Sequence, residues 1–183
     1  MPTVKTKTKS RAAVTGNPRK KVVRACTIRR SPEELFRFWR RLENLPTFAK
    51  HLVAVTQTSD TESRWVAKSP TGHTVEWDAL IINEHENELI AWESKPGSEI
   101  QIAGTVRFQP APAGQGTEVV VAFEYVPPGG RIGEIIAKLY GEEPELQVED
   151  DLMRLKALME AGEIPTTEGQ PTGRDQKNVR RCE

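Results

Sequence analysis

The chain has 183 residues, of which 37% are hydrophobic and 28% charged, and its 26 lysines and arginines balance 26 aspartates and glutamates. This hydrophobic share is lower than is usual for a globular chain, so we expect part of the sequence to lie outside the core. The longest unbroken apolar run, residues 119–123, is far shorter than the ~20 residues that cross a bilayer, which excludes a membrane-spanning helix.

The charges are separated along the sequence. Residues 1–24 carry eight basic residues and no acidic one, whereas residues 25–163 carry 23 acidic residues against 14 basic ones. The remaining residues, 164–183, are close to neutral. We therefore predict a disordered basic arm over residues 1–19, an acidic folded domain over residues 20–163 and a disordered tail over residues 164–183.

The first part of the predicted domain consists of one strand and one helix. Residues 20–29 are predicted as a strand. Ser31 and Glu34 then match a helix start, with serine as N-cap, glutamate at the capping-box spacing and a proline in the first helical position. Residues 44–46 are expected to end this helix, and residues 47–51 to form another short helical turn.

Six further strands are predicted next, separated by turns that contain Gly, Pro, Asp or Asn. In three of these strands apolar residues alternate with charged or polar ones. A period of two with one polar face is typical of an antiparallel sheet that is covered on one side. The six strands are expected over residues 52–58, 63–68, 73–83, 88–94, 99–109 and 117–125.

Apolar residues return to helical spacing near the end of the domain. Helical spacing is found over residues 132–139 and is interrupted over residues 141–144. It continues from Val148 to Met159, and Gly162 is expected to end the helix. This order of elements predicts an α+β fold. A curved antiparallel sheet of about seven strands would wrap around a long C-terminal helix, with short helices after the first strand.

Motifs of hydrolytic and metal chemistry are not found. The sequence has no Gly-x-Ser-x-Gly elbow and no phosphate-binding loop. The histidines, His51, His73 and His85, lie in separate segments without metal-ligand spacing and are predicted to be surface or loop residues. Cys26 and Cys182 fit neither a disulfide framework nor a metal site. We therefore predict no metal, no cofactor and a reducing, cytoplasmic location.

The unusual feature is a set of tryptophans, Trp65, Trp77 and Trp92, in three consecutive predicted strands. Small residues such as Ala79 and Gly104 lie among them. A mixture of large and small side chains inside a curved sheet can leave an apolar cavity for a ligand. The same pattern also fits an ordinary filled core, and the pattern alone favours that interpretation.

Several short motifs occur together over residues 20–165. They include Trp65-Val-Ala, Val75-Glu-Trp-Asp-Ala, Ile90-Ala-Trp-Glu-Ser, Gly104-Thr-Val-Arg-Phe and Glu149-Asp-Asp-Leu-Met-Arg-Leu-Lys. In combination they resemble bacterial SRPBCC (START-like) proteins, in the polyketide cyclase/dehydrase and lipid-transport group that includes coenzyme-Q-binding START domains. The resemblance implies a helix-grip fold, with a deep hydrophobic cavity between the curved sheet and the C-terminal helix.

The resemblance favours a ligand pocket over a filled core, with its opening between the strand turns and residues 127–145. It implies binding, or transport, of a hydrophobic small molecule such as a lipid, a quinone or a polyketide-like compound. The predicted ligand-binding residues are Trp65, Trp77, Trp92, Ile102, Val106, Phe108, Val121, Phe123, Tyr125, Leu139 and Leu155.

A cyclase or dehydratase that uses the same cavity is the alternative. Its polar groups would come from Glu93, Ser94, Arg107 and Tyr125. By alternation, however, Arg107 falls on the wet face and Glu93 points away from Trp92, so acid–base catalysis is disfavoured. No catalytic residue is assigned.

The basic arm has three interpretations, of which a solvated tail is the simplest. Its charges could instead attract anionic lipid headgroups at ~1 kcal/mol each, or the phosphates of a nucleic acid. No aromatic residue lies among these basic residues, so the arm is not expected to stack on bases. Nucleic-acid binding is therefore not expected. If the arm is functional, we expect peripheral contact with an anionic membrane. The basic residues concerned are Lys5, Lys7, Lys9, Arg11, Arg19, Lys20 and Lys21.

Overall fold

The structure is a computed structural model that describes residues 20–68, 72–98, 100–125 and 144–164. Seven strands form one antiparallel sheet in the order β1-β7-β6-β5-β4-β3-β2. The strands are β1 (Lys20–Ile28), β2 (Leu52–Gln57), β3 (Glu62–Lys68), β4 (Thr74–His85), β5 (Leu89–Ser94), β6 (Ile102–Pro110) and β7 (Thr117–Tyr125).

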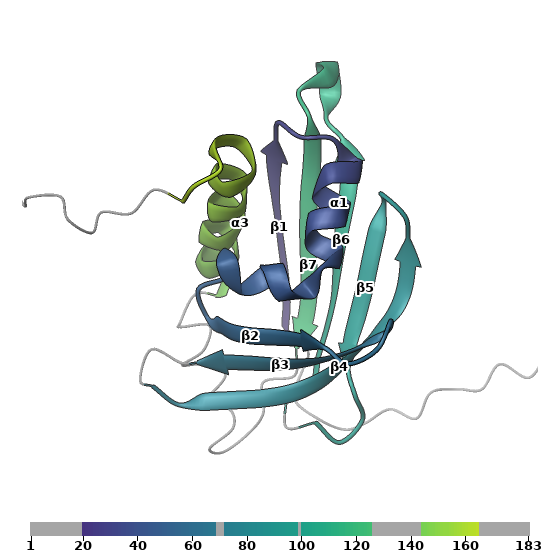
Figure 1. Cartoon of the computed structure of the whole chain (residues 1–183), viewed down its shortest axis with the longest axis vertical. Helices are drawn as coiled ribbons and strands as arrows, with labels where there is room; N and C mark the ends of the chain where they lie inside the picture. Colours follow the sequence, from purple (N-terminus) through teal and green to yellow (C-terminus); the bar gives the residue numbers. More distant parts are fainter. Residues whose placement is uncertain (1–19, 69–71, 99, 126–143, 165–183) are drawn as a thin grey trace, which may run out of the picture.

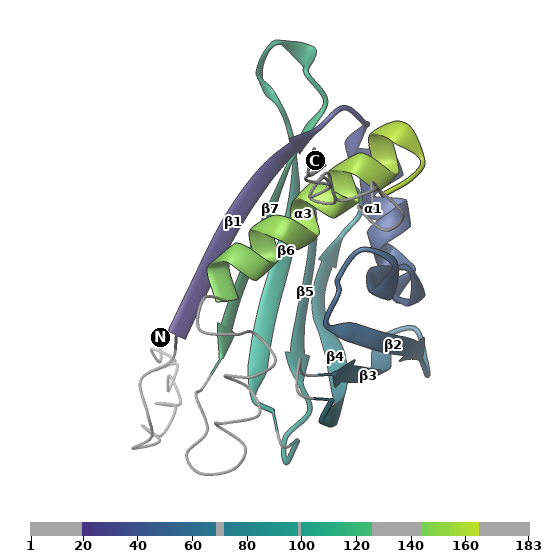
Figure 2. The same cartoon turned by 90° about the vertical axis from the view of Figure 1, so that its left-hand side faces the viewer.

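The helical elements are α1 (Pro32–Arg40), α3 (Pro144–Ala161) and the 3-10 helices η1 (Leu42–Thr47) and η2 (Pro112–Gly114). Of these, α1, η1 and α3 lie on one side of this sheet, whereas η2 lies in the turn between β6 and β7 (Figures 1 and 2). The sheet is strongly curved, and α3 runs along β1 (Figures 1 and 2). This arrangement confirms the predicted α+β helix-grip fold. No helix in the described ranges is long and apolar enough to cross a bilayer.

Alternation along the strands separates the core from the outer face. On β7 the residues from Thr117 to Tyr125 alternate between buried and half-buried positions, so that Val119, Val121 and Phe123 all face the helices. β-branched and aromatic side chains suit such a half-covered pleated surface. The inner face of the sheet therefore supplies most of the hydrophobic core.

Helix α1 begins where the capping-box pattern predicts. The backbone N–H of Glu34 donates to Ser31 Oγ, and the N–H of Ser31 donates to Glu34 Oε2, both at 3.2 Å. The helix buries Leu35, Phe36 and Trp39. The Phe36 ring packs edge-on against Phe108 of β6, with the ring centroids 5.9 Å apart.

The structure differs from the prediction in the segment that follows α1. The prediction of a helical turn over residues 47–51 is wrong. The helix forms earlier in the sequence, as η1 (Leu42–Thr47), and contains Pro46. Proline lacks a backbone N–H and so removes a single bond from this short helix. The N–H groups of Phe48 and Ala49 both donate to Leu45 O and close its end. Residues 48–51 then form the turn into β2.

Some predictions lie outside the described residues. These are the basic arm over residues 1–19, the helical spacing over residues 132–139, which includes Leu139, most of the expected opening over residues 127–145, and the tail from residue 165. They stay predictions.

The capping box gives a test of the helix start. Replacing Ser31 by alanine removes the acceptor of the Glu34 N–H, and we expect a loss of about 1 kcal/mol in the free energy of unfolding. Urea denaturation measures it. Ser31→Asp, which keeps an acceptor, should retain most of the stability, and an alanine variant as stable as the wild type would contradict the role of the cap.

Candidate ligand-binding cavity

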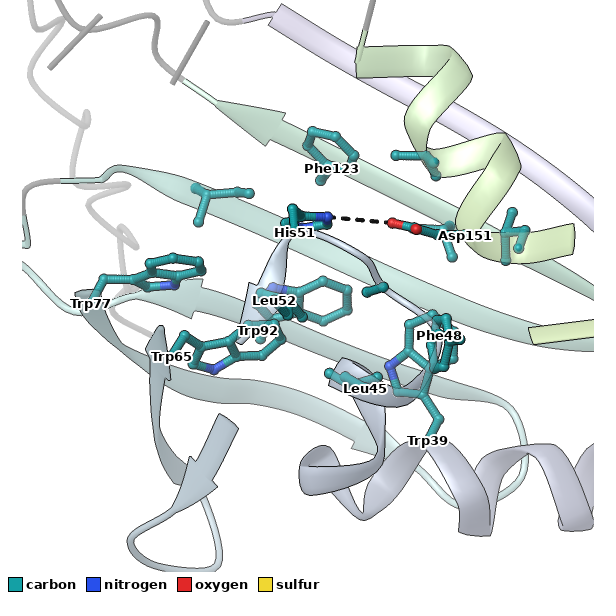
Figure 3. Close-up of a pocket in the computed structure, with 15 residues that line it drawn as sticks. Trp39, Leu45, Phe48, His51, Leu52, Trp65, Trp77, Trp92, Phe123 and Asp151 are labelled. Carbon is teal, nitrogen blue, oxygen red and sulfur yellow. Dashed lines mark ion pairs between the residues drawn. The ribbon is translucent and has the colours of Figure 1, made fainter. Parts of the chain in front are cut away.

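A cavity of about 90 Å³ lies between the inner face of the sheet and the helical side of the molecule (Figure 3). The sheet contributes Trp65, Trp77, Trp92, Ile102, Val121 and Phe123. The α1–β2 region and α3 contribute Trp39, Leu45, Phe48, Ala49, His51, Leu52, Val148, Asp151 and Leu152. The cavity is smaller than the ~300–1,000 Å³ of sites for drug-sized ligands, and its size suits a single ring or one part of a longer molecule.

Three stacked indoles form one wall of the cavity. Trp65 on β3 pairs directly with Trp77 on β4. Their ring centroids are 5.7 Å apart with an angle of 24° between the planes, and Trp65 stacks on Trp92 at 6.3 Å and 15°. Trp65 therefore contacts both other indoles, and the three near-parallel rings form a continuous aromatic wall.

Gly104 makes room for the third indole. The register of β5 and β6 places Gly104 opposite Trp92. A Cβ atom built on Gly104 would lie 2.4 Å from Cζ2 and 2.7 Å from Cε2 of Trp92. The indole thus lies directly over the glycine backbone, which is the combination of large and small residues that the sequence suggested.

The polar residues considered for catalysis have other environments. The hydroxyl of Ser94 accepts from Ile102 N at 3.1 Å and donates to Ile102 O at 3.2 Å, so it joins β5 to the start of β6. Arg107 is exposed. Burial raises the pKa of the Tyr125 phenol, but neither Tyr125 nor Glu93 lines the cavity.

Two titratable side chains that the sequence reasoning missed do line it. His51 Nδ1 lies 3.4 Å from Asp151 Oδ2 (Figure 3), and Asp151 Oδ1 accepts from the backbone N–H of Lys50 at 3.2 Å. Their side chains are only 12% and 8% exposed. His51 is in a turn, as predicted, but it is not a surface residue. Within the described part of the chain, no group of three His, Cys, Asp or Glu side chains could hold a metal ion.

These contacts hold the turn before β2 against α3. Arg154, one helical turn after Asp151, donates from Nε to Phe48 O at 2.9 Å. One sequence signal could have found Asp151, because it stands three residues after Val148 and so shares the apolar face of the predicted helix. A carboxylate on such a face needs a partner. His51 gave no comparable signal, because its partner lies about 100 residues further along the chain.

Six of the predicted ligand-binding residues line the cavity, namely the six from the sheet. Four others, Val106, Phe108, Tyr125 and Leu155, are buried in the core without lining it. Phe108, for example, packs edge-on against Phe36 and Trp39. Sequence reasoning also missed the apolar wall from the α1–β2 region and α3, which only the tertiary packing brings to the sheet.

The close approach at Gly104 predicts the effect of one added methyl group. Gly104→Ala would push the Trp92 ring out of the stack, and we expect a loss of about 1–3 kcal/mol in the free energy of unfolding with a weaker near-UV circular dichroism signal. Ala103→Ser, on the other face of the same strand, is the control. Unchanged stability and spectrum in Gly104→Ala would contradict this packing.

The buried carboxylate gives a second prediction. Asp151→Ala leaves the Lys50 N–H without its acceptor and removes the carboxylate that lies 3.4 Å from His51 Nδ1, and we expect it to cost about 1–3 kcal/mol in the free energy of unfolding. The matched control is Asp150→Ala, one position earlier in the same helix, where the residue is exposed. Chemical denaturation of the two variants should separate them, and equal stabilities would show that the Asp151 contacts contribute nothing.

Comparison with known proteins agrees with this fold. The solved structure of a Deinococcus radiodurans protein is 38% identical with a TM-score of 0.64, and the match covers 78% of this chain and 99% of that one. A Thermus thermophilus protein is 26% identical with a TM-score of 0.64 and the same coverage. The Zhui aromatase/cyclase of a Streptomyces species, 10% identical over 80% of this chain and all of that one, shares the fold with a TM-score of 0.60.

No curated protein matches the chain at a significant level. The family model described as polyketide cyclase / dehydrase and lipid transport, however, matches residues 28–153, which is most of the sequence. The chain therefore belongs to the polyketide cyclase/dehydrase and lipid transport family.

Proposed function

We propose that the protein binds a hydrophobic small molecule, such as a lipid, a quinone or a polyketide-like compound, in the cavity between the sheet and the helical elements. The observation that carries this proposal is the wall of three stacked indoles beside unfilled space. Protein interiors are normally packed to crystal-like density, so space next to three large rings favours a binding role over a purely structural one.

The volume of the cavity limits how a ligand would fit. About 90 Å³ accommodates one ring or the end of a chain. A quinone would place its ring, and a lipid one end of its tail, against the indoles. Any part of the ligand beyond one ring or one chain end would have to lie outside the cavity or displace the side chains that line it.

Catalysis in the same cavity is a second candidate, and the pair formed by His51 and Asp151 favours it. A proton-transfer reaction needs a positioned acid or base, and these are the only titratable side chains among the described residues that line the cavity. Some solved structures with this fold are described as aromatase/cyclases. We rank binding first, because the remainder of the lining is apolar apart from indole N–H groups.

Contact of the basic arm with an anionic membrane remains part of the proposal. Lys20 and Lys21, where the arm meets β1, are exposed and so accessible to lipid headgroups. A membrane-associated arm would bring the cavity close to a source of apolar ligands.

A cavity-filling variant tests the proposal. Val121 lines the cavity, whereas Val23 is 43% exposed on β1. We expect Val121→Phe to weaken the binding of toluene, measured by isothermal titration calorimetry, at least about tenfold, because the added ring occupies the space. Val23→Phe, the same substitution on the outside, should bind like the wild type. Equal binding by both variants, or none by the wild type, would contradict the proposal.

Protein purified from its own host distinguishes the two candidates. Native mass spectrometry should find an apolar molecule on the wild type that Val121→Phe has lost. If that molecule is released unchanged after incubation, binding is supported. Conversion into a cyclised or dehydrated product would support the enzyme.

A further inference from the structure

The indole N–H of Trp77, a residue that lines the cavity, is a buried hydrogen-bond donor without a partner in the described structure. Trp77 lines the cavity and is 6% exposed, and its Nε1 atom is buried without a hydrogen-bond partner in the described structure. The neighbouring indole differs, because Trp65 Nε1 donates to Ser63 Oγ at 2.8 Å. Two stacked rings of the same kind therefore have opposite hydrogen-bonding states.

An unpaired buried donor needs an explanation. The large majority of buried side-chain polar atoms in proteins are paired, and a buried tryptophan N–H usually finds an acceptor. A phenylalanine would supply a flat apolar ring here without the unpaired group. The indole at this position is therefore explained if something that enters the cavity accepts its hydrogen bond.

The other polar groups of the lining limit what that acceptor is. Both oxygens of Asp151 already have neighbours within the protein, since Oδ1 accepts from Lys50 N and Oδ2 lies 3.4 Å from His51 Nδ1. Figure 3 shows Trp77 and Asp151 on opposite sides of His51. No lysine or arginine is among the described lining residues, and His51 already lies against Asp151, so an anion would meet the Asp151 carboxylate with no further basic side chain to neutralise it. The lining thus favours a neutral acceptor.

We propose that Trp77 determines specificity by donating from Nε1 to a neutral oxygen of the ligand, such as the carbonyl oxygen of a planar conjugated ring that lies against the indole wall. This inference rests on the proposed binding function and narrows it. A ring compound that carries a carbonyl group would supply an acceptor for the Trp77 N–H, whereas a pure hydrocarbon chain leaves that N–H unpaired.

The test compares two ligands that differ in one group. Acetophenone and α-methylstyrene carry the same phenyl ring and methyl group and are of similar size, and a carbonyl oxygen in the first is a methylene group in the second. Trp77→Phe keeps an aromatic ring and removes the donor. Calorimetry gives the dissociation constants of both ligands for both proteins. We expect the preference for acetophenone over α-methylstyrene to fall about tenfold in Trp77→Phe, which corresponds to about 1.4 kcal/mol.

Trp65→Phe is the comparison variant. It alters the same wall, so the affinities for both ligands can change, but the N–H of Trp65 is already used by Ser63 Oγ, and the ratio between the two affinities should stay as in the wild type. A preference that stays the same in Trp77→Phe, with both ligands bound, would overturn the inference and leave the binding function standing. That result would also fit a water held at Nε1. If neither ligand binds the wild type, the proposed function and this inference fall together.

A measurement on the wild type covers the case in which Trp77→Phe does not fold. Nitrogen-15 spectra resolve the indole N–H groups of the four tryptophans. Acetophenone should move the Trp77 indole proton downfield, as expected for a new hydrogen bond, and α-methylstyrene should not. Equal shifts with both ligands would contradict the inference.

Discussion

The register between β3 and β4 is the constraint on which the shape of the cavity depends. It places Trp65 opposite Trp77 on the inner face, and stacking of Trp92 against Trp65 continues the wall to β5. Because side chains alternate with a period of two, a slip of one residue in either strand would turn the indole of that strand to the outside. Aromatic pairs of this kind add about 0.5–1.5 kcal/mol each beyond the burial of their area, so the wall also stabilises the register that forms it.

The opposite wall depends on polar contacts. Asp151 and Arg154 of α3 hold residues 48–51 through Lys50 N, His51 and Phe48 O. These bonds satisfy a carboxylate that would otherwise be costly to bury. The same contacts bring Phe48 and Leu52 to the cavity, so the helix both closes the space and fixes its lining.

Much of the fold could be predicted from the sequence, since periodicity and turn residues act locally. The seven strands and the Ser31 cap are confirmed, and the inward face of β7 follows from its alternation alone. The segment after α1 could not be predicted, because Pro46 fits either a break or a short 3-10 helix. The His51–Asp151 contact was missed for a different reason, since it joins two distant segments and leaves no local pattern.

Only the part of the candidate site that the sheet contributes could be predicted from the sequence. The sheet residues that line the cavity were found because strand alternation reports which face each occupies. Val106 and Phe108 share that face and yet lie in filled core, since the helices above them leave no space. Where space remains is decided by packing between elements, and only the three-dimensional arrangement of α1, η1 and α3 reveals it.

The central claim is that an apolar ring lies against the indole wall inside this cavity. The most direct test is a crystal of the protein soaked in bromobenzene, with an anomalous difference map to locate the bromine. We predict a peak enclosed by Trp65, Trp92 and Phe123. A map with no peak in the cavity, or with peaks only beside exposed side chains such as Val23 and Ile82, would contradict the claim.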